Sequence, residues 1–236
     1  MTRMGKRNHT MLVAIDTSTE IASLALVREN VLVAEQTWRT ARNHTVELLP
    51  ALQNLLKLAK AETKDLTGVI VAKGPGSFNG LRVGISAAKG IAYSLSIPIV
   101  AVNSLEVEAY QFAETGLPIC PIFSAGRQEI ATALFQQRDG KWQQLKSGDI
   151  MTVEKLCNDI HEKTLFCGEY AGAVALQLKS FLNEQAVIAS PLTDLRRAAY
   201  LAELGAKKMA LGEVDDVATL QALYLRRPPI GEKKQK

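Results

Sequence analysis

Short runs of apolar residues alternate along this chain with segments whose apolar residues recur at helical spacing. Such alternation is typical of an α/β protein. In the first half of the chain, apolar runs bounded by turn-forming residues predict strands over residues 11–16, 21–27, 31–38, 68–72 and 99–102. Because the first three runs follow one another closely, they predict a three-stranded meander.

Helical spacing begins at Asn43, a residue type that favours the helix N-cap. Pro50 lies inside the pattern, so we expect a bend or a late helix start there. A second helix is expected from near Leu81 to the residue before Pro98, and a third over residues 104–114. The apolar face of the first helix consists of Leu48, Leu52, Leu55, Leu56 and Ala59.

The strand over 68–72, the second helix and the strand over 99–102 predict a βαβ unit with a right-handed crossover. The second half of the chain repeats this order less clearly. No sequence repeat is detectable, so two related α/β lobes are inferred from element order alone. The strands predicted there cover 119–124, 130–136, 141–146, 164–167 and 186–189, and the helices cover 153–162, 170–182 and 194–211.

The predicted organisation is two lobes between short tails. Among the 236 residues, 47% are hydrophobic and 22% are charged, as in ordinary folded domains. This composition excludes a disordered chain and a small disulfide-framework protein. We expect a disordered tail over 1–10, an N-terminal lobe over 11–104, a smaller C-terminal α/β lobe over 105–225 and a basic tail over 226–236.

The formal net charge of +4 is carried by the two ends of the chain. Residues 1–10 contribute +3 and residues 226–236 contribute +4, which leaves a net charge of −3 on residues 11–225. A body of that charge lacks the broad positive field of a protein that grips nucleic acid by itself. Tight binding of nucleic acid by this chain alone is therefore disfavoured.

Cysteine usage and hydropathy point to the cytoplasm. Cys120, Cys157 and Cys167 are widely spaced and form no CxxC pair, which indicates reduced thiols in a cytosolic protein. The apolar run near the N-terminus is too short for a signal peptide. No stretch approaches the roughly 20 apolar residues of a membrane span, so we expect no membrane segment.

The turn after the first strand is one candidate for chemistry. Asp16, Thr17, Ser18 and Thr19 offer a carboxylate, hydroxyls and backbone N–H groups at one strand end, a set that can hold a phosphate or a metal-bound phosphate. The same residue types also form an Asx turn, which satisfies its own backbone. The spacing alone favours the Asx turn.

The glycine-rich loop from Gly74 to Gly80 is the second candidate. Gly74 and Gly76 permit close backbone approach, and with Ser77 they precede a helix start that can bind an anion. The loop is not a P-loop, because Leu81 and Arg82 follow Gly80 in place of Lys-Ser/Thr. An anion site and a tight structural connection are both compatible with this loop, and Arg82 can hold either a phosphate or a partner's carboxylate.

Metal and nucleophile chemistry is disfavoured. His9, His44 and His161 form no spaced pair, because Leu48 occupies the position that would complete HxxxH after His44. Ser124 follows an apolar strand with no nearby His or acid to activate its hydroxyl. The sequence therefore predicts no catalytic residue and no metal site.

Several segments together resemble one protein family. They are residues 14–19 (AIDTST), the helix start 43–45 with 48–50, residues 73–92 (KGPGSFNGLRVGISAAKGIA) and the terminal 224–226. Their order across nearly the whole chain, and the specific GPGSF-x-GLR-x-G stretch, are similar to the TsaB (YeaZ) family. This resemblance implies the actin, sugar kinase and Hsp70-like (ASKHA, ribonuclease H-like) fold, with two related lobes of mixed sheets.

The resemblance also implies a function. Members of that family are the dimerisation subunit of the bacterial machinery that adds threonylcarbamoyl to the adenosine at position 37, beside the anticodon, of tRNAs reading ANN codons. It implies a non-catalytic scaffold that binds the catalytic paralogue TsaD and, with it, the ATPase TsaE, while a TsaC-type synthase supplies threonylcarbamoyl-adenylate. It further implies contact with tRNA only through the complex, a homodimer when alone and no required cofactor.

The predicted partner interface lies on the first two helices, which would form a four-helix interface with the same pair in a partner. After one apolar face of each helix is assigned to the sheet, Leu49, Val83, Ala87 and Tyr93 remain outside it. Together with the resemblance, this predicts an interface of Leu49, Arg82, Val83, Ser86, Ala87, Lys89, Gly90 and Tyr93.

Two residues depart from the family pattern. Asn79 stands where the family usually has Thr, and Ser124 where many members have Asp, while Arg127 is retained.

Two other functions stay open. A kinase or ATPase of the superfamily would need a second phosphate loop, for which 167–169 is the nearest candidate. A glycoprotease-like metallopeptidase lacks a metal site to activate water. Weak nucleotide binding at vestigial phosphate loops would involve Asp16, Thr17, Ser18, Gly74, Gly76 and Ser77.

Overall fold

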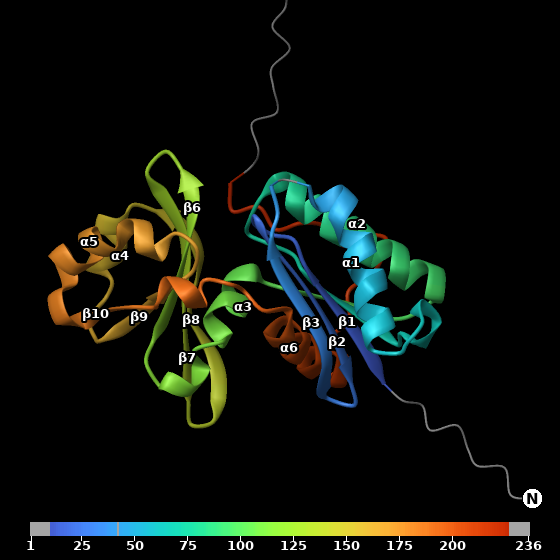
Figure 1. Ribbon diagram of the computed structural model, residues 1–236. Helices are drawn as coiled ribbons and strands as arrows, with labels where there is room; N and C mark the ends of the chain where they lie inside the picture. Colours follow the sequence, from blue (N-terminus) through green and yellow to red (C-terminus); the bar gives the residue numbers. More distant parts are fainter. Residues whose placement is uncertain (1–9, 42, 227–236) are drawn as a thin grey trace, which may run out of the picture.

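The computed structural model describes residues 10–41 and 43–226. The expected N-terminal tail, apart from Thr10, and the expected basic tail, apart from Arg226, lie outside these residues. The chain forms two five-stranded sheets with helices on both faces of each (Figure 1).

The first sheet and its helices come from both ends of the chain. The strands run in the order β3-β2-β1-β4-β5, with β1 antiparallel to β2 and parallel to β4. The strands are β1 (Met11–Asp16), β2 (Ile21–Arg28), β3 (Val31–Arg39), β4 (Gly68–Ala72) and β5 (Ile99–Val102). The helices packed on this sheet are α1 (His44–Leu58), α2 (Phe78–Leu95) and α6 (Ala198–Ala210), and a 3₁₀ turn η1 spans Thr63–Asp65.

The second sheet has the same topology. Its order is β8-β7-β6-β9-β10, with β6 antiparallel to β7 and parallel to β9. Its strands are β6 (Ile119–Gly126), β7 (Glu129–Arg138), β8 (Lys141–Met151), β9 (Thr164–Cys167) and β10 (Ala186–Ile188). The helices are α3 (Ser104–Tyr110), α4 (Val153–Asn158) and α5 (Ala171–Leu182), with 3₁₀ turns at Ala113–Thr115, Asn183–Gln185 and Pro191–Thr193. The equivalent strand orders confirm two related lobes of mixed sheets.

The layers explain why both lobes bury a continuous core. Helices α1 and α2 cover the outer face of the first sheet, and α6 covers its inner face. In the second lobe, α4 and α5 pack on the outer face and α3 on the inner face. Figure 1 shows α3 and α6 between the two sheets. After β10 the chain returns to the first lobe, where α6 packs on the first sheet, and the C-terminal segment then reaches the second lobe again through Leu225 and Arg226.

The helix starts differ from the expected ones. Helix α1 begins at His44, so Pro50 does not delay the helix start. Asn43 is its N-cap residue, but the Asn43 side chain makes no capping hydrogen bond. Helix α2 begins at Phe78, earlier than expected, because the Ser77 hydroxyl caps it by accepting from the Gly80 N–H. Helix α6 begins at Ala198, four residues later than expected.

Other boundaries also shift. Helices α3 and α4 are shorter than the expected 104–114 and 153–162, with part of the difference at α3 taken up by the 3₁₀ turn at 113–115. Strand β8 extends to Met151, beyond the expected end at 146, and its pairing with β7 shifts register at two places. No helix within the described residues is long and apolar enough to cross a membrane.

Candidate functional site

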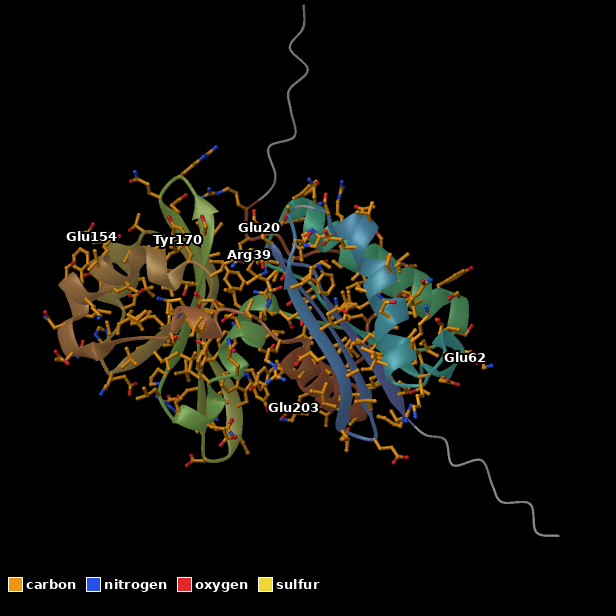
Figure 2. The ribbon with its side chains drawn as sticks, in the orientation of Figure 1. Glu20, Arg39, Glu62, Glu154, Tyr170 and Glu203 are labelled. Atoms are coloured by element: carbon orange, nitrogen blue, oxygen red, sulfur yellow. The ribbon has the colours of Figure 1, made fainter. Side chains whose placement is uncertain are left out.

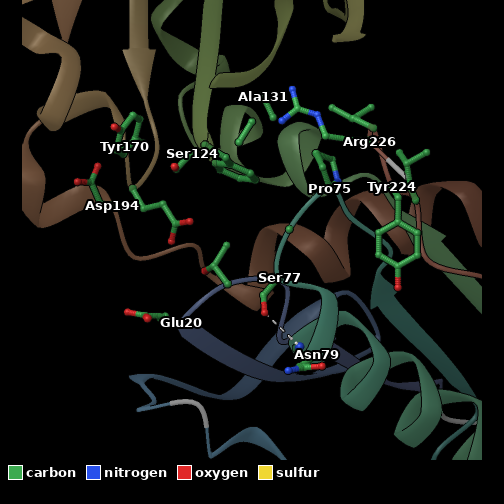
Figure 3. A pocket seen from close by; sticks show the side chains of 18 of the residues that line it. Glu20, Pro75, Ser77, Asn79, Ser124, Ala131, Tyr170, Asp194, Tyr224 and Arg226 are labelled. Atoms are coloured by element: carbon green, nitrogen blue, oxygen red, sulfur yellow. Dashed lines mark hydrogen bonds between the residues drawn. The ribbon is translucent and has the colours of Figure 1, made fainter. Parts of the chain in front are cut away.

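A cavity of about 870 Å³ lies between the two lobes, where the predicted loops meet (Figure 3). The β1–β2 turn contributes Glu20 and the glycine-rich loop contributes Ser77 and Asn79. The second lobe contributes Ser124 from β6 and Tyr170 from the loop before α5. Further lining residues are Asp194 in the linker to α6 and Tyr224 and Arg226 in the C-terminal segment.

The β1–β2 turn is an Asx turn whose polar groups have partners. The Ser18 backbone N–H and hydroxyl both donate to Asp16 Oδ1, at 2.8 and 2.6 Å. The Thr17 hydroxyl donates to the Gly80 carbonyl at 2.7 Å. All three side chains are buried. The hydrogen bonds are those of the structural interpretation that the spacing favoured.

The glycine-rich loop packs backbone to backbone on that turn. A Cβ atom at Gly76 would lie 2.0 Å from the Ser18 carbonyl oxygen, and one at Gly80 would lie 2.1 Å from the Thr17 carbonyl oxygen. The Ser77 N–H donates to the Ser18 carbonyl at 2.6 Å, and the Gly74 N–H donates to the Ser104 hydroxyl at 3.1 Å. The loop therefore makes the tight structural connection, one of its two predicted roles.

The structure thus brings Asp16, Thr17, Ser18 and the glycine-rich loop together as expected, but their polar groups bond to one another. Ser77, at the cavity, caps α2. Nucleotide binding at these residues stays a prediction, one that would require Asp16 to exchange a partner that the sequence did not reveal.

That partner is Arg196, in the linker before α6. Its Nε donates to Asp16 Oδ2 at 2.5 Å, and its Nη2 donates to Ser18 Oγ at 2.9 Å and to Thr19 Oγ1 at 3.2 Å. Nη1 lies 3.6 Å from Glu108 Oε2 in α3. The Arg196 side chain is only 3% exposed. Arg196 fell inside a predicted helix, and no local pattern marks an arginine whose partner Asp16 is 180 positions away.

Burial dominates the titration of the acids around this arginine. Burial raises the pKa of Glu108 to about 8, because the Arg196 charge that lowers it is outweighed by burial and by the carboxylates of Asp194, Glu169 and Asp16. Burial, and then the nearby Glu169, raise the pKa of Asp194 at the cavity to about 6. Burial thus disfavours the charged form of both acids, although Arg196 lies beside Glu108.

His44 has a structural contact. It is buried, and its Nε2 lies 2.8 Å from the Thr19 carbonyl oxygen, while Leu48 on the next turn is buried in the core. Within residues 10–41 and 43–226, no group of three or more His, Cys, Asp or Glu side chains could hold a metal ion. The three cysteines are buried and free, and burial raises the pKa of the Cys120 thiol to about 12.

The outer face of α1 and α2 carries the predicted interface residues. Tyr93 is 80% exposed and Leu49 is 51% exposed, whereas Val83 and Ala87 are half-buried beside the core. A Cβ atom at Gly90 would meet nothing within 4 Å. We call this face the α1/α2 surface; it comprises Leu49, Arg82, Val83, Ser86, Ala87, Gly90 and Tyr93. Figure 1 shows the two helices side by side on the outside of the first lobe.

Two members of the predicted interface are already engaged within the chain. The Lys89 ammonium donates to the carbonyls of Ala218 and Leu220 in the C-terminal segment, at 3.1 and 3.2 Å. The Arg82 guanidinium lies over the Phe78 ring, 4.3 Å from its centroid. Side chains elsewhere on the surface are drawn in Figure 2, which labels Tyr170 and Arg39 near the junction of the lobes.

Comparison with known proteins identifies relatives over most of the chain. The family model of TsaD, tRNA N6-adenosine threonylcarbamoyltransferase, matches residues 35–223. The tRNA threonylcarbamoyladenosine biosynthesis protein TsaB of Bacillus subtilis is 34% identical over 218 residues, which cover 91% of this chain and 93% of that protein. The protein of the same name from Escherichia coli is 35% identical over 94 residues, which are 40% of each chain.

Solved structures share the fold. A Pseudomonas aeruginosa protein described as similar to the peptidase YeaZ has a TM-score of 0.80 and 25% identity, covering 92% of this chain and 100% of that chain. Component A of (R)-2-hydroxyglutaryl-CoA dehydratase from Acidaminococcus fermentans has a TM-score of 0.51 and 11% identity, covering 86% of this chain and 99% of that chain. These neighbours confirm the ASKHA-like α/β fold with two mixed sheets.

Proposed function

The chain belongs to the TsaB (YeaZ) family, and from this membership we infer that it takes part in the biosynthesis of threonylcarbamoyladenosine in tRNA. We propose that it acts there as a non-catalytic subunit, required for modification of the adenosine at position 37 of tRNAs reading ANN codons. Its partners in this proposal are a TsaD-type catalytic paralogue and, with it, a TsaE-type ATPase. It works in the cytoplasm, requires no cofactor of its own and meets tRNA through the complex.

The α1/α2 surface is the observation that carries this proposal. Leu49 and Tyr93 expose large apolar side chains, although each helix already buries its opposite face against the sheet. Between them lie the small residues Ser86, Ala87 and Gly90 of α2. Because their side chains are short or absent, a partner helix can approach closely. An exposed apolar stripe around small residues is the form that a helix-packing interface takes. The same face, if self-complementary, supports a homodimer when the partner is absent.

The groups that would perform chemistry in the alternative functions are occupied by the fold. Asp16, the carboxylate that a phosphotransferase would use, is paired with Arg196. His44, the first residue of a broken metal-binding pair, contacts the Thr19 carbonyl. The hydroxyls of Ser18 and Thr19 accept from Arg196, and that of Thr17 donates to the Gly80 carbonyl, which supports a scaffold in preference to a kinase or a metallopeptidase.

Association with a purified TsaD-type paralogue tests the proposed surface. Ala87→Glu places a charged side chain in the middle of the α1/α2 surface, where a partner helix would bury it without a partner charge. We expect this variant to bind the paralogue at least about 100-fold more weakly than the parent chain, a loss of about 2.7 kcal/mol. Isothermal titration calorimetry measures the Kd of each protein.

Ala173→Glu is the matched control, because it makes the same substitution at an exposed position in the first turn of α5 in the other lobe. It should bind the paralogue as the parent does. Thermal melts of both variants show whether each is folded. If folded Ala87→Glu binds with the parent's Kd, or if Ala173→Glu loses binding equally, the interface lies elsewhere.

A further inference from the structure

Arg196 is a buried charged residue at the junction of the lobes, 3% exposed, and no role assigned to the chain uses it. Its guanidinium joins the linker that carries it to two other segments far apart in the sequence. Asp16, Ser18 and Thr19 belong to the β1–β2 turn, Glu108 belongs to α3, and Arg196 itself belongs to the linker that returns to α6.

These groups are arranged to bind a planar cation. Nε and Nη2 face Asp16 with both of its carboxylate oxygens, at 2.5 and 3.4 Å, in the forked arrangement that guanidinium and carboxylate favour. The hydroxyls of Ser18 and Thr19 accept from Nη2. The Phe123 ring of the second lobe lies 5.2 Å from Cζ, within reach of a cation–π contact.

Glu108 completes the site, and one of its oxygens has no neighbouring cation in the described part of the chain other than the guanidinium. Glu108 is fully buried, and its Oε2 makes no hydrogen bond within the described residues. The nearest cation to that oxygen is Arg196 Nη1, at 3.6 Å. Its other oxygen accepts from Gln111 Nε2 at 2.8 Å. Burial alone would lower the pKa of Arg196, but the carboxylates of Asp16 and Glu108 raise it above its usual range, so the side chain stays charged.

We propose that Asp16, Ser18, Thr19 and Glu108 form a guanidinium-binding site whose ligand is the chain's own Arg196. The ligand engages both carboxylate oxygens of Asp16. It also holds the linker before α6 against the first lobe, so that occupancy of the site fixes the crossing by which the chain returns from the second lobe to the first.

Chemical replacement of the missing side chain tests this site directly. Arg196→Ala retains Cβ and removes the remainder, which is the structure of ethylguanidinium with its N–H donors intact. We expect the variant to melt at a lower temperature than the parent, and millimolar ethylguanidinium chloride to recover a substantial part of that loss in the variant while leaving the parent unchanged. Ethylammonium chloride and sodium chloride at the same ionic strength should recover much less.

Hydrogen exchange provides a readout that general stabilisation would not move. Amides of residues 190–197 should lose protection in Arg196→Ala and regain it with ethylguanidinium, while those of α5 stay unchanged. The double variant with Asp16→Asn should lose the rescue. Equal rescue by ethylammonium, or rescue that persists in the double variant, would overturn the proposal.

Arg196→Lys keeps the test decisive if Arg196→Ala does not fold. Lysine retains the charge but cannot bond Asp16, Ser18 and Thr19 together, so we expect a lower melting temperature and faster exchange in residues 190–197. A lysine variant that matches the parent in both would show that a planar cation is not required. Because these measurements use the chain alone, their failure would leave the proposed partner binding untouched.

Discussion

Replacing Gly80 by alanine should destabilise the chain, whereas the same substitution at Gly90 should stabilise it slightly. Both residues lie in α2, so both gain the helix propensity of alanine over glycine, about 0.8 kcal/mol in a helix interior. Their surroundings differ. An added Cβ at Gly80 would lie 2.1 Å from the Thr17 carbonyl oxygen, but one at Gly90 would meet nothing within 4 Å.

The magnitude at Gly80 follows from what must move. The contacted oxygen is main chain, held in the β1–β2 turn, so no side-chain rotation relieves the overlap. Displacing α2 from the turn costs about 2 kcal/mol of overpacking, and weakening the hydrogen bond from Thr17 to the Gly80 carbonyl costs about 1 kcal/mol more. Against the propensity gain, the net loss is about 2 kcal/mol, which lowers Tm by about 4–8 °C in a chain of this size.

Thermal and urea unfolding of the isolated chain measure both variants. We expect Gly80→Ala to unfold at lower temperature and lower urea than the parent, and Gly90→Ala at slightly higher values of each. Gly80→Ala as stable as Gly90→Ala would refute the backbone-to-backbone packing of the glycine-rich loop on the turn.

Three further substitutions test other contacts. Glu108→Gln cannot release a proton. Because the folded pKa of Glu108 is raised to about 8, its stabilising contribution is full below its unfolded pKa and is lost as pH rises through 8. The free energy of unfolding of the variant minus that of the parent, measured by urea titration, should therefore rise by up to about 4 kcal/mol between about pH 5 and pH 8. A difference that stays constant with pH would contradict a raised pKa. Ser77→Ala removes the N-cap of α2 and should cost about 1 kcal/mol in the same titration, and no loss would mean that the cap is dispensable. Lys89→Met should speed hydrogen exchange in residues 217–223, which the lysine contacts through two carbonyls; unchanged exchange there would show that other contacts hold the segment.

Element order was predictable from sequence because it depends on local patterns. Apolar runs marked the strands, and the repeated order of elements in the two halves correctly indicated two equivalent lobes. The boundaries were less accurate where a distant contact sets them. Ser77 starts α2 early through its cap, and α6 begins only at Ala198, after the linker residue Arg196 that bonds to the distant Asp16.

In the candidate site, too, local sequence patterns were informative and long-range contacts were not. Asp16, Thr17, Ser18 and the glycine-rich loop were identified because their residue types are distinctive, and the structure places them together. What the sequence could not supply was their partners, since the Arg196 guanidinium comes from the other end of the chain. Glu108 was missed for a similar reason, because an acid in a helix looks like a surface residue until its burial is known.

The central claim, a required but non-catalytic subunit that works through the α1/α2 surface, is tested most directly by reconstituted tRNA modification. Threonylcarbamoyladenosine would be measured by mass spectrometry after incubating tRNA, ATP, threonine and bicarbonate with this chain and TsaC-, TsaD- and TsaE-type proteins, each omitted in turn. We expect product with the full set and with Ala173→Glu, but none with this chain alone, without it, or with Ala87→Glu in its place. Product from this chain alone, or full product in its absence, would contradict the claim.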